Sequence, residues 1–262
     1  MTDSGTERRG IRCVDLSVPV HNFSMERDSA HIFYWNHREG ARRVSRAQNF
    51  DPDQLPDGIA AAAEEVTLHT HTGTHLDAPW HYGPTCGGLP SRTVDEIPLE
   101  WCFSDGVVLD LTHKGPGELI TADDLKEAVR KIGYQIKPYD IALIRTDAIK
   151  HYEKPDFLAC QPGMGRESTL WLLDQGVKIV GIDAWTLDRP LAEMAKDFRA
   201  GDREAYWAAH LVGREREYCQ IEKLANLDLL PKPFGFRVSV FPVKVAQASA
   251  GWVRAVAIFE EE

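Results

Sequence analysis

The sequence predicts a single domain of mixed α/β architecture, and three observations support this prediction. The 262 residues are 43% hydrophobic and 27% charged, a composition with which one domain buries roughly 75% of the surface that the unfolded chain exposes. Short β-branched or apolar segments alternate with segments of helical pattern. No internal repeat or low-complexity linker divides the chain. We therefore expect one domain over residues 1–262.

Six short segments are predicted to form strands, because β-branched and apolar residues dominate them. They are residues 66–71, 106–111, 140–145, 178–182, 236–245 and 252–259. The last two follow each other closely along the chain, so we expect them to be neighbours in an antiparallel pair.

Three further segments have the pattern of helices, namely residues 121–132, 167–175 and 203–211. The first begins at Thr121, whose hydroxyl can cap a helix N-terminus, and it is followed by Gly133, a frequent helix stop. The second and third are followed in the same way by Gly176 and Gly213. These helices complete the alternation from which the α/β architecture is inferred.

Residues 21–60 are polar, rich in Arg and Asp, and show little periodicity. We expect them to form a long excursion from the domain. A loop of this length inside a compact domain is usually functional. It is therefore expected to cover a site or to reach a neighbouring subunit.

Charge and composition narrow the class of partner. The formal net charge is -10, which opposes binding to nucleic acid, because that binding depends on clusters of Lys and Arg. A small-molecule substrate is expected instead. The start of the chain lacks the apolar core of a secretory signal, and no segment approaches the ~20 apolar residues of a membrane span. We therefore expect no membrane association and a cytoplasmic location.

Four of the ten histidines lie between residues 69 and 81. Imidazole and carboxylate groups suit Zn, Mn or Fe, and three protein ligands with one open position are usual for a catalytic metal. His71, His75 and Asp77 can form such a set. Gly73 and Pro79 oppose a helix here. We expect a strand that runs into a tight turn at Gly73 and folds the later ligands back toward the first.

Other residues near this cluster have roles suggested by their chemistry. His81 lies one short loop beyond the ligands, and its unperturbed pKa of ~6.5 suits proton transfer in both directions, so it is the candidate general base. Thr74 is expected to orient a ligand. His69 either supports the site, packs in the protein or faces solvent. Three tryptophans either line an aromatic pocket or pack in the core: Trp80, Trp185 and Trp252.

The cluster is part of a longer motif, His71-x-Gly73-Thr74-His75-x-Asp77-x-Pro79-x-His81. It resembles the signature H-x-G-T-H-x-D-x-P-x-H of the cyclase-like metal-dependent hydrolases, a family that includes bacterial kynurenine formamidases and isatin hydrolases. Residues 15–19 resemble the family's opening strand and residues 243–257 its closing hairpin. The resemblance implies a swivelling β/β/α fold with a mixed sheet. It also implies a homodimer or homotetramer, in which parts of the N-terminal excursion close a neighbouring subunit's pocket.

The same resemblance adds two residues to the site. Family members use a distant His and a later Glu or Gln, and His210 and Glu222 match that separation. The implied catalytic residues are His81, His210 and Glu222. The implied ligands of one or two divalent ions, Mn or Zn, are His71, His75, Asp77, His210 and Glu222. The number of ions stays open, because formamidases of the family resemble binuclear enzymes and the isatin-type members hold one Mn.

The expected function is hydrolysis of a carbonyl–nitrogen bond in a small cyclic or aromatic amide by metal-activated water. Ring opening of the isatin type and deformylation of the N-formylkynurenine type both fit. Hydrolysis of a lactone, imide or carbamate is the alternative within the same class. From another class, a non-haem metal oxygenase or a non-catalytic metal-binding module would use a similar ligand set.

Overall fold

The computed structural model describes residues 10–22 and 29–260. The chain divides into two compact units. The larger unit comprises Met1–Val18 and Gly73–Glu262, and the smaller unit is Pro19–Thr72. The expectation of one domain with an excursion at residues 21–60 stays a prediction.

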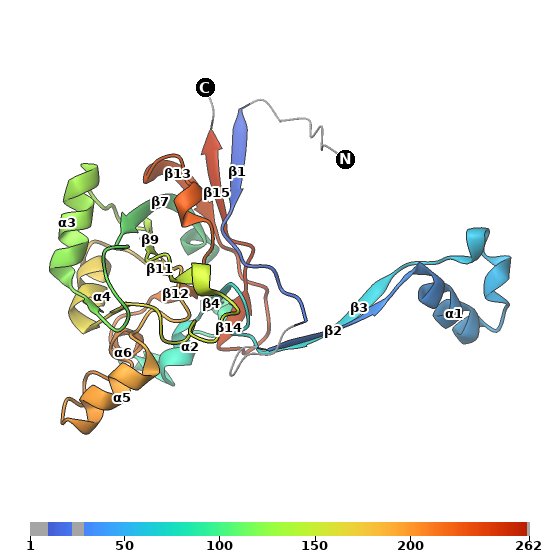
Figure 1. Ribbon diagram of the computed structural model, residues 1–262, viewed down its shortest axis with the longest axis horizontal. Coiled ribbons are helices and arrows are strands. Elements are labelled where there is room, and N and C mark those ends of the chain that lie inside the picture. Colours follow the sequence, from blue (N-terminus) through green and yellow to red (C-terminus); the bar gives the residue numbers. More distant parts are fainter. Residues whose placement is uncertain (1–9, 23–28, 261–262) are drawn as a thin grey trace. The chain divides into compact units, whose positions relative to one another are not determined.

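The larger unit is built on a nine-stranded mixed sheet (Figure 1). Its strands are β1 (Ile11–Asp15), β4 (His75–Asp77), β7 (Phe103–Asp110), β9 (Ile141–Arg145), β11 (Ile179–Ile182), β12 (Cys219–Glu222), β13 (Phe234–Ser239), β14 (Ala250–Trp252) and β15 (Val256–Glu260). Their order is β1-β15-β13-β7-β9-β11-β12-β4-β14. From β7 to β12 neighbouring strands are parallel, and the other pairs are antiparallel. The sheet therefore has a parallel centre and antiparallel edges, as the mixed α/β prediction requires.

Apolar side chains cover both faces of this sheet. Along β9, Ile141 and Leu143 belong to one buried cluster, and Ala142 and Ile144 belong to another. Alternate residues of a strand point to opposite faces, so a continuous apolar run is typical of a parallel strand that is covered on both sides. The core thus lies on both sides of the central strands.

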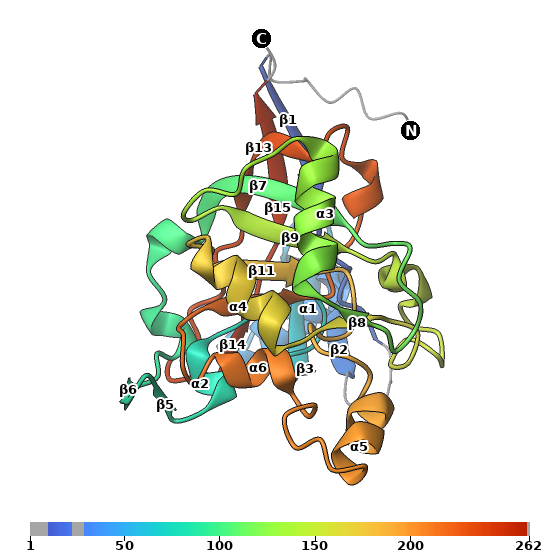
Figure 2. The ribbon, with the colours of Figure 1, turned by 90° about the vertical axis from the view of Figure 1, so that its left-hand side faces the viewer.

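Helices of the larger unit are α2 (Pro79–Tyr82), α3 (Ala122–Ile132), α4 (Arg166–Asp174), α5 (Leu191–Arg199) and α6 (Ala208–Val212). In Figure 2, α3 and α4 lie together over one face of the sheet, and α6 lies beside α4. Two short pairings complete this unit: β5 (Thr85–Cys86) with β6 (Leu89–Pro90), and β8 (Leu119–Ile120) with β10 (Gly163–Met164). Among residues 10–22 and 29–260, none of the helices combines the length and apolar character needed to cross a membrane.

The helix predicted over residues 121–132 is confirmed, and its ends have the expected chemistry. Thr121 is the N-cap: its hydroxyl accepts from the backbone N–H of Asp124, whose carboxylate accepts in return from the N–H of Thr121. Gly133 ends the helix in the left-handed region, at φ 64. Caps on both sides explain why the sequence located this helix well.

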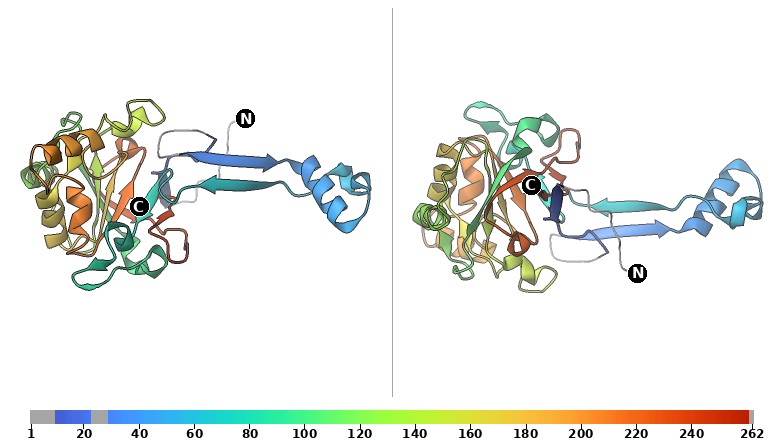
Figure 3. Two further views of the ribbon diagram at one scale, coloured as in Figure 1. Left: turned by 90° about the horizontal axis from the view of Figure 1, so that it is seen from below. Right: turned by 90° about the horizontal axis from the view of Figure 1, so that it is seen from above.

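Apart from the strand predicted over residues 66–71, the smaller unit contains regular structure that the sequence did not lead us to expect. Its elements are β2 (Ala30–Trp35), α1 (His37–Gln48), the 3₁₀ turns η1 (Pro52–Gln54) and η2 (Pro56–Gly58), and β3 (Ala63–Leu68). Figure 3 shows β2 and β3 as a two-stranded ribbon that ends at α1. Helix α1 is largely polar, and its buried residues are the small side chains Ala41 and Ser45. The reciprocal capping of Asn36 and Glu39 is the signal that identifies it.

Two of the predicted strands have different bounds in the structure. The run at 236–245 ends as a strand at Ser239, and the run at 252–259 is divided between β14 and β15. Strands β13 and β15 are antiparallel neighbours as expected, whereas β14 pairs with β4. The division arises because the N–H of Val253 donates to the carbonyl of Thr74, whereas the N–H of Ala255 donates to the hydroxyl of Ser17. The residues between β14 and β15 therefore do not pair with one neighbouring strand.

Two helices also depart from the sequence prediction. The helix expected over 203–211 begins only at Ala208, because Trp207 has left-handed backbone angles, φ 58 and ψ 38. Helix α5 was not predicted; it starts directly after Pro190, a residue that fits only at or before the first turn. The strand expected over 66–71 is β3, which ends three residues earlier at Leu68.

Candidate metal centre

The turn before β4 sets the direction of two candidate ligands. Gly73 has φ 67, a conformation that favours glycine, and the chain then enters β4. His75 and Asp77 are two positions apart in this strand, so their side chains share one face, and both are fully buried. The Nδ1 of His75 lies 2.8 Å from the carbonyl oxygen of Gly73. Since that carbonyl can only accept, Nδ1 carries a proton, and the ring directs Nε2 toward the site.

Glu222 reaches the same place from the neighbouring strand. In the pairing of β12 with β4, Glu222 lies opposite His75, so the two side chains project from the same face. The Nε2 of His75 is 3.2 Å from Oδ1 of Asp77 and 3.5 Å from Oε2 of Glu222. The potential ligand atoms of this buried trio lie within 4.8 Å of one another.

His210 approaches from the other side of the two carboxylates. Its Nε2 lies 4.0 Å from Oδ2 of Asp77 and 3.9 Å from Oε1 of Glu222. Each carboxylate therefore directs one oxygen toward His75 and the other toward His210. Helix α6, which carries His210, follows the left-handed residue Trp207, whose ring packs on that of His210 with centroids 4.4 Å apart.

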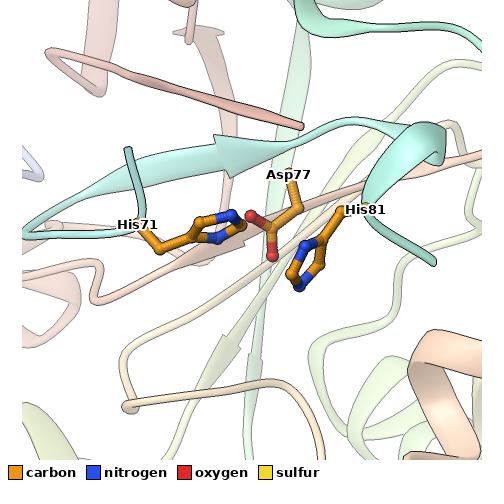
Figure 4. A group of neighbouring side chains, drawn as sticks. All are labelled: His71, Asp77 and His81. Atoms are coloured by element: carbon orange, nitrogen blue, oxygen red, sulfur yellow. The ribbon is translucent and has the colours of Figure 1, made fainter. Parts of the chain in front are cut away.

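Figure 4 shows His81, a further predicted residue, beside Asp77. A potential ligand atom of His81 lies within 4.8 Å of one of Asp77. His71, the remaining predicted ligand, belongs to the smaller unit. His81 is carried by the short helix α2 and is exposed, and its ring centroid is 5.3 Å from that of His210. An exposed imidazole beside a buried ligand group has the access to water that a proton carrier needs.

The electrostatics of the buried trio fit a divalent cation. Burial alone lowers the pKa of His75, but the carboxylate of Asp77 raises this pKa to about 9. The two carboxylates therefore attract positive charge into a place that excludes water. Imidazole nitrogens with carboxylate oxygens form a donor set suited to Zn or Mn. The residues present thus fit a metal ion.

Asp188 is a part of the site that the sequence did not reveal. Its Oδ2 accepts from Nδ1 of His210 at 2.5 Å and from the backbone N–H of His210 at 3.2 Å, and its Oδ1 accepts from the N–H of Ala209 at 2.8 Å. Burial lowers the pKa of His210, while the hydrogen bond to Asp188 raises it. Its place in the sequence could have indicated a site residue, because Asp188 follows the carboxyl end of the parallel strand β11. α/β proteins bind ligands at that edge of the sheet.

Thr74 has a different role from the one expected. Its hydroxyl donates to the backbone carbonyl of Lys223 at 2.6 Å and accepts from the N–H of Val18 at 3.0 Å. It therefore joins backbone segments beside Glu222 and does not bond to a candidate ligand. His69 lies before the turn, with its ring centroid 5.2 Å from that of His71.

The three tryptophans singled out from the sequence have different surroundings. Trp185 is buried, Trp80 is 44% exposed on α2, and Trp252 lies opposite His75 in the pairing of β14 with β4. Cys86, the cysteine nearest the motif, has a pKa raised by burial, which opposes formation of a nucleophilic thiolate.

Comparison with known proteins gives one family and one fold. A family model described as "Putative cyclase" matches residues 14–189. A kynurenine formamidase from Bordetella avium (strain 197N) is 29% identical over 207 residues, which are 78% of this chain and 83% of that protein.

Two solved structures share the fold. Isatin hydrolase A from Ralstonia solanacearum has a TM-score of 0.74 at 24% identity, covering 95% of this chain and 92% of that one. A protein described as a potential metal-dependent hydrolase with cyclase activity has a TM-score of 0.62 at 19% identity, covering 96% and 100%. The mixed α/β fold inferred from the sequence is therefore that of these cyclase-like proteins.

Proposed function

Because the chain belongs to the Cyclase family, whose model matches residues 14–189, we propose that it is a metal-dependent hydrolase of a carbonyl–nitrogen bond in a small cyclic or aromatic amide. The observation that carries the proposal is the buried group of His75, Asp77 and Glu222. The similar proteins include a kynurenine formamidase and an isatin hydrolase, which supports amide hydrolysis over an oxygenase or a binding module. The predicted cytoplasmic location stays a prediction.

The ligands of the metal are His71, His75, Asp77, His210 and Glu222. The support within the larger unit is that both carboxylates lie between two imidazole Nε2 atoms. These side chains would hold one or two divalent ions, and Asp77 and Glu222 would supply the negative charge that such ions need. When bound, a divalent ion polarises a carbonyl as a Lewis acid and lowers the pKa of coordinated water toward ~7. Mn and Zn are the proposed metals.

The protein's own side chains orient the reactants and move the proton. We assign the substrate carbonyl and the attacking water to the space beside the two carboxylates. The Nε2 atoms of His75 and His210 border the same space. His81 takes the proton from that water and returns it to the nitrogen that leaves. Its exposed imidazole then exchanges with solvent.

The exposed apolar surface of the smaller unit supports the proposal that the protein assembles as a homodimer or homotetramer. A two-stranded ribbon is marginally stable alone, and this one exposes aromatic rings on both of its faces, since Phe33 and Tyr34 are adjacent and 58% and 54% exposed. Val66 of β3 is exposed as well. Apolar surface of this kind marks an interaction site. We assign it to a second copy of the chain.

A substrate screen tests the proposed activity. Protein loaded with Mn or with Zn is incubated without dioxygen with isatin, N-formylkynurenine, a cyclic imide, a lactone and a carbamate, and acid release is followed. We expect turnover of an amide that is lost on chelation and restored by metal. An activity that requires dioxygen and iron, or protein that binds metal and hydrolyses none of the compounds, would contradict the proposal.

A further inference from the structure

The segment that follows β11 is irregular yet strongly held. Residues 183–190 form neither helix nor regular strand. Within them, the N–H of Leu187 donates to Oε1 of Glu222 at 3.3 Å, and the carboxylate of Asp188 accepts from the side chain and backbone of His210. One short segment thus contacts two candidate ligands that come from different elements.

A buried amide makes four of the hydrogen bonds that hold this segment. Gln161 is fully buried, and its Nε2 donates to the carbonyls of Thr186 and Asp188, both at 2.8 Å. Its Oε1 accepts from the N–H groups of Trp185, at 2.8 Å, and Thr186, at 3.4 Å. All four bonds go to backbone groups, so Gln161 replaces the ladder of hydrogen bonds that a regular strand would supply.

Gly163 lets the backbones come together at this point. A Cβ added at Gly163 would lie 2.2 Å from the carbonyl carbon of Asp188 and 2.2 Å from the backbone nitrogen of Arg189. Only glycine permits that approach. Residues 161–163 therefore form a fixed support behind Asp188.

We propose that Asp188, held by Gln161, is a positioning residue that fixes the tautomer and direction of His210. The carboxylate can only accept, so it keeps the proton of His210 on Nδ1 and leaves Nε2 bare toward Asp77 and Glu222. The same segment fixes Oε1 of Glu222 through Leu187. Asp188 touches no reacting atom; it acts through His210. The inference rests on the proposed function in taking His210 as a metal ligand.

The test compares two buried aspartates of the same segment. In Asp188→Asn the amide has one accepting oxygen and one donating nitrogen, so it cannot accept all three N–H groups. Asp183 is the matched control: it is 1% exposed, and its carboxylate also accepts three bonds, from Thr146 and Asp147. Asp183→Asn therefore removes an equivalent network away from His210.

Two readouts are measured on both variants and the wild type, at a temperature where all are folded by circular dichroism. The first is affinity for Mn and Zn by chelator competition, and the second is the tautomer of His210 in metal-free, ¹⁵N-histidine-labelled protein, recorded at a high pH at which the imidazole is neutral. We expect Asp188→Asn to weaken metal binding about 10–100-fold and to populate the tautomer with the proton on Nε2. We expect Asp183→Asn to change neither.

Gln161→Glu provides a second, independent variant. Its carboxylate loses the two donors and faces the carbonyls of Thr186 and Asp188, so the segment should move and metal affinity should fall. Gln175→Glu is the control, since its amide makes one long bond at 3.4 Å. Equal metal affinity in Asp188→Asn and Asp183→Asn, or an unchanged His210 tautomer in Asp188→Asn, overturns the inference. Wild-type protein that binds no metal would instead contradict the proposed function, and the tautomer still tests the positioning role.

Discussion

Glu222 is the residue on which the number of metal ions depends. Its two oxygens lie toward two different imidazoles, and with Asp77 it supplies enough negative charge for a pair of dications. We expect two Mn or Zn ions per wild-type chain and one in Glu222→Gln, because the amide keeps the shape and removes a charge. Mass spectrometry of native, metal-saturated protein measures this. The control is Glu217→Gln, which changes a partly exposed Glu paired with Arg92.

One ion per wild-type chain under saturating metal would contradict this prediction before any variant is made. In that case Glu222→Gln should keep its ion and lose only turnover or substrate affinity.

His81 is the residue that separates metal binding from proton transfer. We expect His81→Ala to retain its metal and to lose about 10²–10⁴-fold in turnover, the usual contribution of general acid–base catalysis. Metal content and steady-state kinetics on the substrate found in the screen measure both effects. His113→Ala, which removes another exposed histidine, should leave turnover unchanged. If His81→Ala turned over at the wild-type rate, His210 would be the next candidate for the base.

Asp147 tests electrostatics away from the site. The hydrogen bond from Arg145 holds the pKa of Asp147 below its usual value, so the unfolded chain binds more protons below about pH 4. The ionised group therefore stabilises the fold above that pH, and this stabilisation is lost as the pH falls through the lowered pKa. Asn tolerates the left-handed backbone at this position, φ 63.

Asp147→Asn should be about 0.5–1 kcal/mol less stable than wild type at pH 7, the usual contribution of a partly exposed ion pair. The difference should narrow below pH 4 and with added salt. Urea midpoints at pH 7 and pH 3 measure it. A difference that stays constant between these pH values would show that the ion pair is not its cause.

At the scale of elements, helix α6 is held in place by aromatic packing. A Cβ added at Gly213, just after the helix, would lie 2.0 Å from the ring of Tyr82. That ring stacks on Tyr218 and contacts the ring of His210. We expect Gly213→Ala to lower stability by about 1–3 kcal/mol, because overpacking forces rings from their rotamers, and to weaken metal binding through His210.

Thermal unfolding and metal affinity of Gly213→Ala measure the two effects. Gly115→Ala is the control, since the nearest atom to its added Cβ is the end of the Glu118 side chain, 3.3 Å away. Equal thermal stability and equal metal affinity in the two variants would show that the ring of Tyr82 moves without disturbing α6.

The elements that the sequence located well are those with local signals. Helix α3 has caps at both ends, and β9 is a short apolar run, so both could be identified without tertiary information. The bounds of α6 could not, because the left-handed turn at Trp207 depends on packing against His210. The division of the run at 252–259 likewise arises from bonds to distant segments.

The same distinction applies to the candidate site. The spacing within one turn and strand identified His75 and Asp77, whereas His210 and Glu222 came only from the family resemblance. Asp188 could not be selected, because its partner His210 lies 22 residues away in sequence and no periodicity relates them. Contacts between segments that are distant in the sequence therefore bring His210, Glu222 and Asp188 to the site.

At the scale of the whole molecule, we expect the ribbon of the smaller unit to determine assembly. Replacing the exposed rings in the double variant Phe33→Ser, Tyr34→Ser should shift the mass of the particle toward that of one chain, because apolar surface buried between copies is lost. Light scattering after size exclusion, over a range of concentrations, measures the mass. Leu229→Ser changes a similarly exposed apolar residue of the larger unit, 59% exposed, and should leave the mass unchanged. A monomeric wild type would contradict the assignment.

The position of β4 in the sheet has a consequence for the newly made protein. This strand lies between β12 and β14, so residues 75–77 pair only with segments that the ribosome produces much later. At roughly 5–20 residues per second, the 142 residues from Ala78 to Cys219 take about 7–28 s to synthesise. During most of that time His75 and Asp77 have neither strand neighbour, and neither His210 nor Glu222 has been made. The proposed metal site is therefore complete only once Glu222 has been added to the chain.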